Sequence, residues 1–188
     1  MEIRENESLR DARIEYFERS GFAPDGGYDD KWVAVDLGRF TIKFPNSAAR
    51  RRAVQYHDLH HIVTGYGTDL RGEAEISAWE VASSCRDMVA AWILNLLAVG
   101  HVLIREPRAL YRAFIRGRQS NNLYLYTYDD ALLARSVSEV REELGLDSQL
   151  HKPTMGNRLA FIGWGSLAIA LAWGPVVGLI GLLAWWLI

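Results

Sequence analysis

The chain has almost no cysteine and no large excess of charge of either sign. Of its 188 residues only one is a cysteine, Cys85, and the formal net charge is −2. A single thiol cannot form an internal disulfide, and because Cys85 lies in an apolar stretch we expect an inert, buried thiol in a reducing compartment. Without a broad excess of Lys and Arg, nucleic-acid binding is not expected. The length suits one domain of about 100–200 residues with an appendage.

Charge is also missing from the C-terminus, since no residue from 159 to 188 is charged. This stretch exceeds the roughly 20 apolar residues that cross a bilayer. As a straight helix it would be about 45 Å long, which is more than a bilayer core needs. Because Gly174 and Pro175 interrupt it, we predict one tilted or kinked membrane anchor, with a re-entrant hairpin as the alternative. Lys152 and Arg158 precede the stretch, so the folded domain is predicted on the cytoplasmic side of the inner (plasma) membrane.

Two histidines on one predicted helix are candidate metal ligands. The pattern is His57-Asp58, two residues, then His61. Residues 48–64 predict one helix, with Asn46 or Ser47 as its N-cap. Since a helix turns once in 3.6 residues, both imidazoles project from the same face and Asp58 lies beside them.

A glutamate follows His61 after eleven intervening residues. The connection contains three glycines, which let the chain reverse within a few residues. A second helix, capped by Thr68 or Asp69 and starting near Glu73, would run back antiparallel to the first. We therefore predict a divalent-metal site built from His57, Asp58, His61 and Glu73. Two imidazoles and two carboxylates suit Zn²⁺, and they would also accept iron, manganese or cobalt.

Neighbouring polar residues receive simpler interpretations. His60 lies about 100° around the helix from His61, so we expect it to face solvent or to support the ligands from behind. Glu75 and Glu80 are expected to be solvated helix charges. The alternating tyrosines at 124, 126 and 128 are expected in an extended segment that covers the core.

The remaining patterns predict a mainly α fold, a helical bundle with a small β-hairpin near the N-terminus. Alternating apolar residues on both sides of Gly38-Arg39 predict that hairpin at about 31–44. Residues 88–104 are expected to form a buried central helix continuous with the one near Glu73, walling a lipid-binding groove. Further helices are predicted between Arg105 and Arg118, after Asp129, and from Ser138 to Leu144. The domain division is 1–150 for the metal-binding domain, 151–158 for a linker and 159–188 for the membrane tail.

The motif resembles a known family. The segment from His57 to His61, with Gly65 and then Gly72-Glu73, is similar to the zinc-binding signature of the coenzyme Q (ubiquinone) biosynthesis proteins that organise the ubiquinone synthesis complex. Pro45-Asn46-Ser47 and the residues from Arg141 to Leu146 extend the likeness to roughly 45–146. The hairpin and the apolar tail depart from that family, so the resemblance indicates a divergent, membrane-anchored member.

The resemblance implies a function. The equivalents of His57, Asp58, His61 and Glu73 bind the metal in that family, and its members are implicated in removing the ring carboxyl of a polyprenylated quinone precursor, with hydroxylation at that carbon. We expect Asp58 or Glu73 to shuttle the proton. The expected partners are a prenylated quinone precursor or other isoprenoid lipid, the membrane, and other quinone-biosynthesis enzymes. The spacing of Gly174 and Gly178 also suits helix pairing in a homodimer.

Two alternatives come from other classes of protein. His57-Asp58-x-x-His61 differs by one methylene from the His-Glu-x-x-His motif of metallopeptidases, which leaves a zinc-dependent hydrolase open. A non-catalytic, lipid-binding scaffold with a structural metal would need the same ligands and the same groove as a catalyst.

Overall fold

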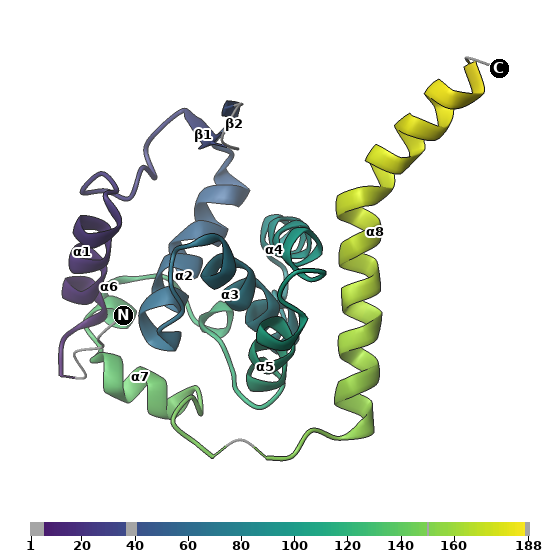
Figure 1. The fold of residues 1–188 in the computed structure, drawn as a ribbon. Helices are drawn as coiled ribbons and strands as arrows, with labels where there is room; N and C mark the ends of the chain where they lie inside the picture. Colours follow the sequence, from purple (N-terminus) through teal and green to yellow (C-terminus); the bar gives the residue numbers. More distant parts are fainter. Residues whose placement is uncertain (1–5, 37–40, 150, 187–188) are drawn as a thin grey trace.

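The structure is a computed structural model that describes residues 6–36, 41–149 and 151–186. Helices dominate it, and one two-stranded sheet lies near the N-terminus (Figure 1). This agrees with the predicted fold class. In chain order the elements are α1 (Leu9–Ser20), β1 (Trp32–Asp36), β2 (Thr41–Pro45), α2 (Ala48–Thr64), α3 (Leu70–Ser83), α4 (Val89–Val102), α5 (Pro107–Gly117), the 3-10 turn η1 (Leu123–Leu125), α6 (Asp130–Leu133), α7 (Val137–Glu143) and α8 (Met155–Trp186).

The helix pair predicted around the motif is confirmed. The Ser47 side chain caps α2 by accepting from the Arg50 N–H at 3.2 Å, and Gly65 ends the helix in a left-handed conformation at φ 77°. The Asp69 side chain caps α3 through the Gly72 N–H at 3.0 Å. A Cβ on Gly72 would lie 2.2 Å from the carbonyl oxygen of Gly67, so a glycine lets the turn close this tightly. The turn brings the start of α3 back to α2.

The predicted continuous central helix is wrong. α3 ends at Ser83, and α4 begins only at Val89. Between them Ser84 and Arg86 adopt positive φ values of 82° and 52°, and the Asn122 amide donates to the Ser84 carbonyl oxygen at 2.9 Å. Sequence patterns miss this break because neither positive-φ residue is a glycine and the stabilising contact comes from a distant segment. α4 is also only partly buried, with Val89 among its exposed side chains.

The hairpin is confirmed in its strands. β1 and β2 pair antiparallel, with Trp32 opposite Pro45 and Val33 opposite Phe44. The turn predicted at Gly38-Arg39 lies outside the described residues. The hairpin leads directly into α2, so it lies beside the start of the motif helix (Figure 1).

The C-terminal half of the domain follows the predicted helices with one exception. The helix between Arg105 and Arg118 is α5, and the helices predicted after Asp129 and near Ser138 are α6 and α7. The expected extended segment of tyrosines is wrong at its start, where Leu123–Leu125 forms a 3-10 turn capped by the Asn122 side chain. That turn directs Tyr124 into the protein interior.

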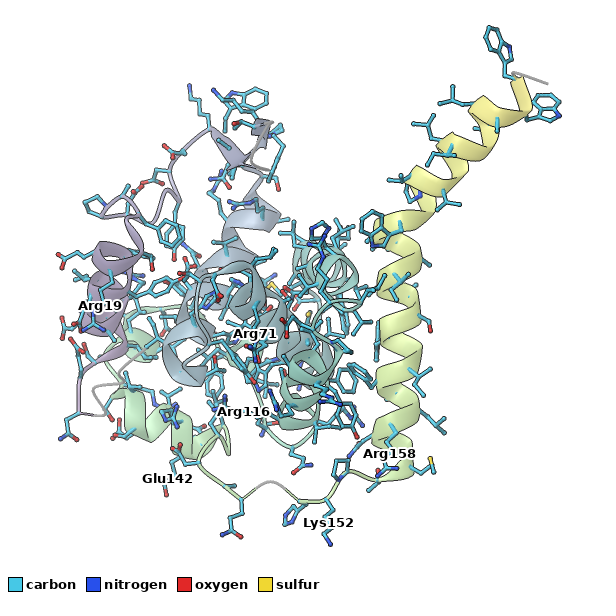
Figure 2. All side chains as sticks on the ribbon, viewed as in Figure 1. Arg19, Arg71, Arg116, Glu142, Lys152 and Arg158 are labelled. Atoms are coloured by element: carbon cyan, nitrogen blue, oxygen red, sulfur yellow. The ribbon has the colours of Figure 1, made fainter. Side chains whose placement is uncertain are left out.

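The apolar tail forms one long helix, α8, which begins at Met155 inside the segment predicted as linker. From its start to just past its middle α8 packs against α4, where Trp164 stacks on Trp92 at 5.0 Å between ring centroids and the Trp173 indole N–H donates to the Gly100 carbonyl oxygen at 3.1 Å. The remainder bends away from the domain (Figure 1), and Pro175 lies inside the helix. By length and composition alone α8 is able to cross a membrane. Lys152 and Arg158 lie at its start (Figure 2).

We predict that Gly100→Ala separates α8 from α4. A Cβ at Gly100 would lie 2.2 Å from the Ala168 carbonyl oxygen, and that backbone atom cannot rotate away as a side chain could. Overpacking of this kind costs about 1–3 kcal/mol. The melting temperature of the full chain in detergent should fall by several degrees and α8 should become more accessible to protease. Gly163→Ala on α8 is the matched control, since a Cβ there has nothing within 4 Å. Equal melting temperatures for the two variants would contradict the predicted contact.

Candidate metal centre

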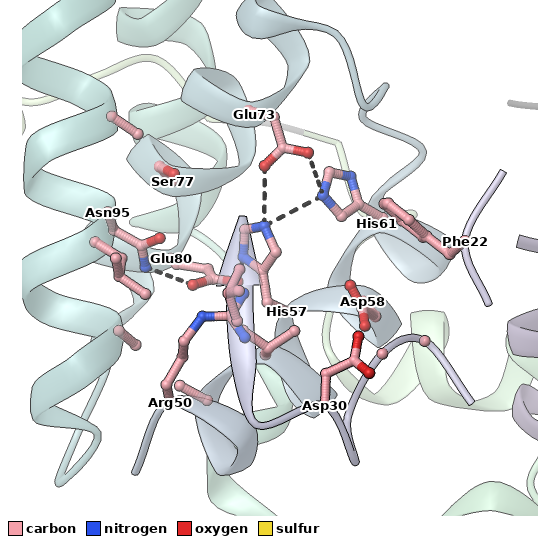
Figure 3. Close-up of a pocket in the computed structure, with 18 of the residues that line it drawn as sticks. Phe22, Asp30, Arg50, His57, Asp58, His61, Glu73, Ser77, Glu80 and Asn95 are labelled. Atoms are coloured by element: carbon pink, nitrogen blue, oxygen red, sulfur yellow. Dashed lines mark hydrogen bonds and ion pairs between the residues drawn. The ribbon is translucent and has the colours of Figure 1, made fainter. Parts of the chain in front are cut away.

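Two histidines of α2 and one glutamate of α3 converge on a single point (Figure 3). The Nε2 atoms of His57 and His61 are 3.2 Å apart, and they lie 3.2 and 3.3 Å from the two carboxylate oxygens of Glu73. One donor atom from each residue lies within 4.8 Å of the others, so the three form a cluster that could hold a metal ion. The predicted return of Glu73 to the histidine pair is therefore observed.

The hydrogen bonds behind the imidazoles fix their tautomers. His57 Nδ1 lies 2.8 Å from Glu80 Oε1, and His61 Nδ1 lies 3.1 Å from the Tyr66 carbonyl oxygen. Both partners accept hydrogen bonds, so each Nδ1 carries the proton and each Nε2 of a neutral ring presents a lone pair. Two lone pairs and a carboxylate then face one another at about 3 Å. This arrangement requires a cation between them, either a proton or a metal ion.

Glu80 organises the site from behind, and its prediction as a solvated charge is wrong. Its carboxylate is fully buried. Oε1 accepts from the Nδ1 atoms of His57 and His60 at 2.8 and 2.7 Å, while Oε2 accepts from the amide of Asn95 and from the Tyr124 hydroxyl at 2.7 Å. Each oxygen thus has two donors, which satisfies a carboxylate that would otherwise be costly to bury.

His60 supports the ligands from the protein interior. Its ring is fully buried, so the solvent-facing alternative is wrong. The backbone N–H of Leu123 donates to Nε2 at 2.9 Å, which leaves Nδ1 protonated and directed at Glu80. Sequence analysis missed Glu80 as a site residue, although its position seven residues after Glu73 places it two turns further along the same face of α3.

Asp58 lies beside the cluster and outside it. Its Oδ2 accepts a hydrogen bond from the Tyr28 hydroxyl at 2.6 Å, and it is not one of the three residues whose donor atoms come together among the described residues. Burial raises the pKa of this carboxyl to about 6, although the Tyr28 hydrogen bond and the charges of His57 and His61 oppose the rise. Its role as a fourth ligand stays a prediction.

A pocket of about 600 Å³ opens onto the cluster. The Glu73 side chain is 39% exposed, so at least one ligand group is accessible from this space. The lining combines polar residues with apolar side chains from the segment before β1 and from α4. The lining includes Phe22, Asp30, Trp32, Arg50, His57, Asp58, Glu73, Glu80 and Leu94. The site is therefore an open one, with room for a ligand larger than water.

We predict that Glu80→Gln weakens metal binding. The amide removes one of the two acceptor oxygens that hold His57 and His60, and supporting groups of this kind contribute about 10–100-fold to metal affinity. The zinc affinity of the purified chain should be measured by competition with a chelating dye, with circular dichroism as a check on folding. Glu75→Gln, on the same helix and paired with Arg71 rather than a histidine, is the matched control. Unchanged affinity in folded Glu80→Gln protein would contradict the role assigned to Glu80.

Metal binding should also strengthen as pH rises. Burial opposes a charge on His57, but the nearby Glu80 and Glu73 carboxylates raise its pKa well above the usual value. Burial likewise opposes ionisation of Glu73, but hydrogen bonds from His57 and His61 lower its pKa to about 2, so Glu73 stays ionised. A metal must therefore displace a proton from His57 at neutral pH, and affinity falls as pH falls.

The measurement is calorimetric titration with zinc between about pH 6 and pH 8, in two buffers with different ionisation enthalpies. One displaced proton corresponds to about a tenfold gain in affinity per pH unit below the pKa of His57. An affinity that does not change with pH, with no proton released, would show that the imidazoles are not ligands.

Comparisons with known proteins support the family suggested by the motif. The chain is 27% identical over 141 residues to a protein of Botryotinia fuckeliana named ubiquinone biosynthesis protein coq4, mitochondrial, and 26% identical over 140 residues to the protein of that name in Sclerotinia sclerotiorum. A protein of Ajellomyces capsulatus with this name is 23% identical over 143 residues. The first two alignments each cover 72% of this chain and 46% of the relative.

The chain thus spans less than half the length of the curated relatives it matches. No family model matches it, and no solved structure matches it. The similarity rests on sequence alignment over about 140 residues of this chain. Over most of its length the chain is therefore similar to coq4 proteins, which are named for ubiquinone biosynthesis.

Proposed function

We propose that this chain is a metal-dependent protein of ubiquinone biosynthesis that binds a polyprenylated aromatic head group and promotes loss of its ring carboxyl. The observation that carries the proposal is the convergence of two Nε2 lone pairs and the Glu73 carboxylate at an open pocket. A structural metal site is normally closed by its ligands, whereas a catalytic one keeps room for substrate. The pathway, ubiquinone biosynthesis, is proposed from the names of the relatives.

His57, His61 and Glu73 would hold the ion, with Asp58 as the fourth ligand proposed from the motif. Zn²⁺ suits this donor set, and iron or manganese would also fit. When bound, the ion would supply Lewis-acid polarisation of an oxygen atom on the head group. Loss of the carboxyl as carbon dioxide leaves an electron pair on the ring carbon, which must then take a proton. A hydroxylation at that carbon would need an oxidant in addition.

The two candidate proton carriers differ in their surroundings. The carboxyl of Asp58, with its pKa raised by burial to about 6, can hold and release a proton near neutral pH. The carboxyl of Glu73 has its pKa lowered to about 2 by the histidines, despite burial, which suits a permanent ligand better than a proton carrier. We therefore assign the proton to Asp58, which would have to leave the ion in order to carry it, with Tyr28 as its hydrogen-bonding partner.

The proposal also includes attachment of the domain to a membrane through α8. α8 is long and apolar enough to hold the domain at a bilayer, where an isoprenoid substrate resides. α4 lines the pocket through Leu94 on one side and contacts α8 through Gly100 on another, so an isoprenoid chain would lie along α4 toward the bilayer. The cytoplasmic side stays a prediction from the positive residues before α8, and the other biosynthesis enzymes and a second copy of this chain stay proposed partners.

The test is His61→Ala. Loss of one Nε2 ligand should reduce bound metal by more than about tenfold, measured by elemental analysis of protein purified in detergent, because this change removes a donor atom directly. Ubiquinone should also fall to background in cells that depend on this chain, with an aromatic acid precursor accumulating. His151→Ala, at an exposed histidine far along the chain, is the control. Normal ubiquinone in the metal-free variant would reject the proposal, while precursor that is bound and never converted by any form of the protein would favour the scaffold.

A further inference from the structure

The pocket at the metal cluster contains a marked excess of acidic groups. Four carboxylates line it, those of Asp30, Asp58, Glu73 and Glu80. Arg50 is the one Lys or Arg residue among its described lining residues. A ligand that is itself an anion would be repelled from such a pocket unless a cation receives it. The surroundings of Arg50 therefore decide whether an acidic ligand can bind.

The Arg50 guanidinium has spare donors directed at no protein group. One Nη donates to the Asn46 side-chain oxygen at 3.0 Å, and the group lies over the Phe44 ring at 5.7 Å from its centroid. The Nε atom is buried and has no hydrogen-bond partner. Among the described residues no carboxylate forms an ion pair with the guanidinium, and the nearby Asp58 carboxylate accepts from Tyr28. A donor left without a partner destabilises the protein, so an acceptor group on a ligand that binds the guanidinium would be favoured.

Asn46 holds this guanidinium in a defined place. Its amide nitrogen donates to three carbonyl oxygens, those of Gly27, Tyr28 and Asp30, at 3.3, 3.2 and 2.9 Å. These bonds orient the Asn46 side chain so that its oxygen faces Arg50. The arginine is thus positioned before any ligand arrives, which lowers the entropy cost of binding.

Two arginines near Arg50 in the sequence or the fold have protein partners, and a third resembles Arg50 only in part. Arg116 donates to the Thr64 carbonyl oxygen at 2.8 Å, and Arg52 forms an ion pair with Asp87 at 3.0 Å. Arg13 also has a buried Nε without a partner, but it does not line the pocket. Only at Arg50, among the described residues, do an unsatisfied guanidinium and the pocket coincide.

We propose that Arg50 is an anion-binding residue that takes the carboxylate of an aromatic acid whose ring lies between Arg50 and the His57–His61–Glu73 cluster. Arg50 and His57 are seven residues apart on α2, which is two turns and roughly 10 Å along the helix axis, and Figure 3 shows Arg50 extending into the same pocket. The planar guanidinium binds carboxylates through paired hydrogen bonds. This inference rests on the proposed function and adds the residue that would recognise the acid.

The rest of the pocket favours a carboxylate on an apolar ligand. Phe22 and Trp32 line it while remaining 47% and 59% exposed, so about half of each aromatic side chain is free to contact a ligand. A single guanidinium balances one negative charge, which matches a carboxylate better than a phosphate dianion in a pocket already rich in acids. An aromatic acid with an apolar substituent meets both requirements.

The experiment measures binding of three probes to the full chain in detergent by calorimetry. The probes are 4-butoxybenzoate, its neutral analogue 4-butoxybenzamide, and butyl phosphate. Arg50→Gln should weaken benzoate binding by at least about tenfold and leave benzamide binding unchanged, because it removes the charge that receives the carboxylate. Arg50→Lys keeps the positive charge but loses the paired N–H donors of the guanidinium, so its benzoate affinity should lie between those of the unaltered protein and Arg50→Gln. Arg52→Gln, at an exposed arginine one turn or less away that does not line the pocket, should match the unaltered protein.

Benzoate bound equally by unaltered and Arg50→Gln protein overturns the proposal, as does a larger loss for butyl phosphate than for benzoate. If Arg50→Gln does not fold, Arg50→Lys provides the test. Unchanged benzoate binding by Arg50→Lys would exclude recognition through the paired hydrogen bonds of the guanidinium. Repeating the titrations after chelation separates the two proposals. If metal-free protein still prefers benzoate over benzamide, and the preference depends on Arg50, the anion site is supported. This holds even if His61→Ala leaves ubiquinone production normal, a result that would reject only the metal-dependent function.

Discussion

The buried carboxylate of Glu80 is the group on which the geometry of the site depends. It receives four hydrogen bonds from donors on α2, α4 and the segment after α5, so one side chain joins three parts of the chain. Because Glu80 accepts from His57 Nδ1, the opposite nitrogen of that ring is left as a lone pair toward Glu73. Without a buried acceptor here, the ring could turn or change its tautomer, and the three facing acceptor atoms would have no reason to stay together.

Close backbone approach provides the frame around this network. The turn before α3 closes because Gly72 has no Cβ, which would lie 2.2 Å from the Gly67 carbonyl oxygen. Gly117 allows a similar approach of α5 to α3, because its Cβ would lie 2.3 Å from the Trp79 carbonyl oxygen. Helices held this near each other bury the polar network almost completely, which strengthens every charged hydrogen bond within it. The same burial makes each missing partner expensive, so the network tolerates few substitutions.

The sequence predicted the parts of the site that are set by local geometry. Histidine spacing on α2, caps at Ser47 and Asp69, and glycines in the turn each act within a few residues, and the return of Glu73 follows from them. The features that the sequence did not reveal depend on contacts between residues far apart in the chain. Glu80 looked like an ordinary helix charge because two of its donors, Asn95 and Tyr124, come from elements whose placement depends on the break after α3. The positive-φ residues at that break are Ser84 and Arg86 rather than glycines, so the sequence pattern wrongly predicts that residues 88–104 continue the earlier helix.

α4 is the element through which the buried network and the apolar tail are connected. Asn95 on one side donates to Glu80, and Gly100 on another admits the backbone of α8 and accepts from the Trp173 indole. A helix in contact with both cannot shift far without disturbing one of them, since interiors packed this closely have few alternative arrangements. The position of α8 therefore constrains the wall of the pocket, and anchoring α8 in a bilayer would fix that wall relative to the membrane surface. In this way a tail with no charged residue contributes to the same site as the histidines, although no residue of α8 lines the pocket.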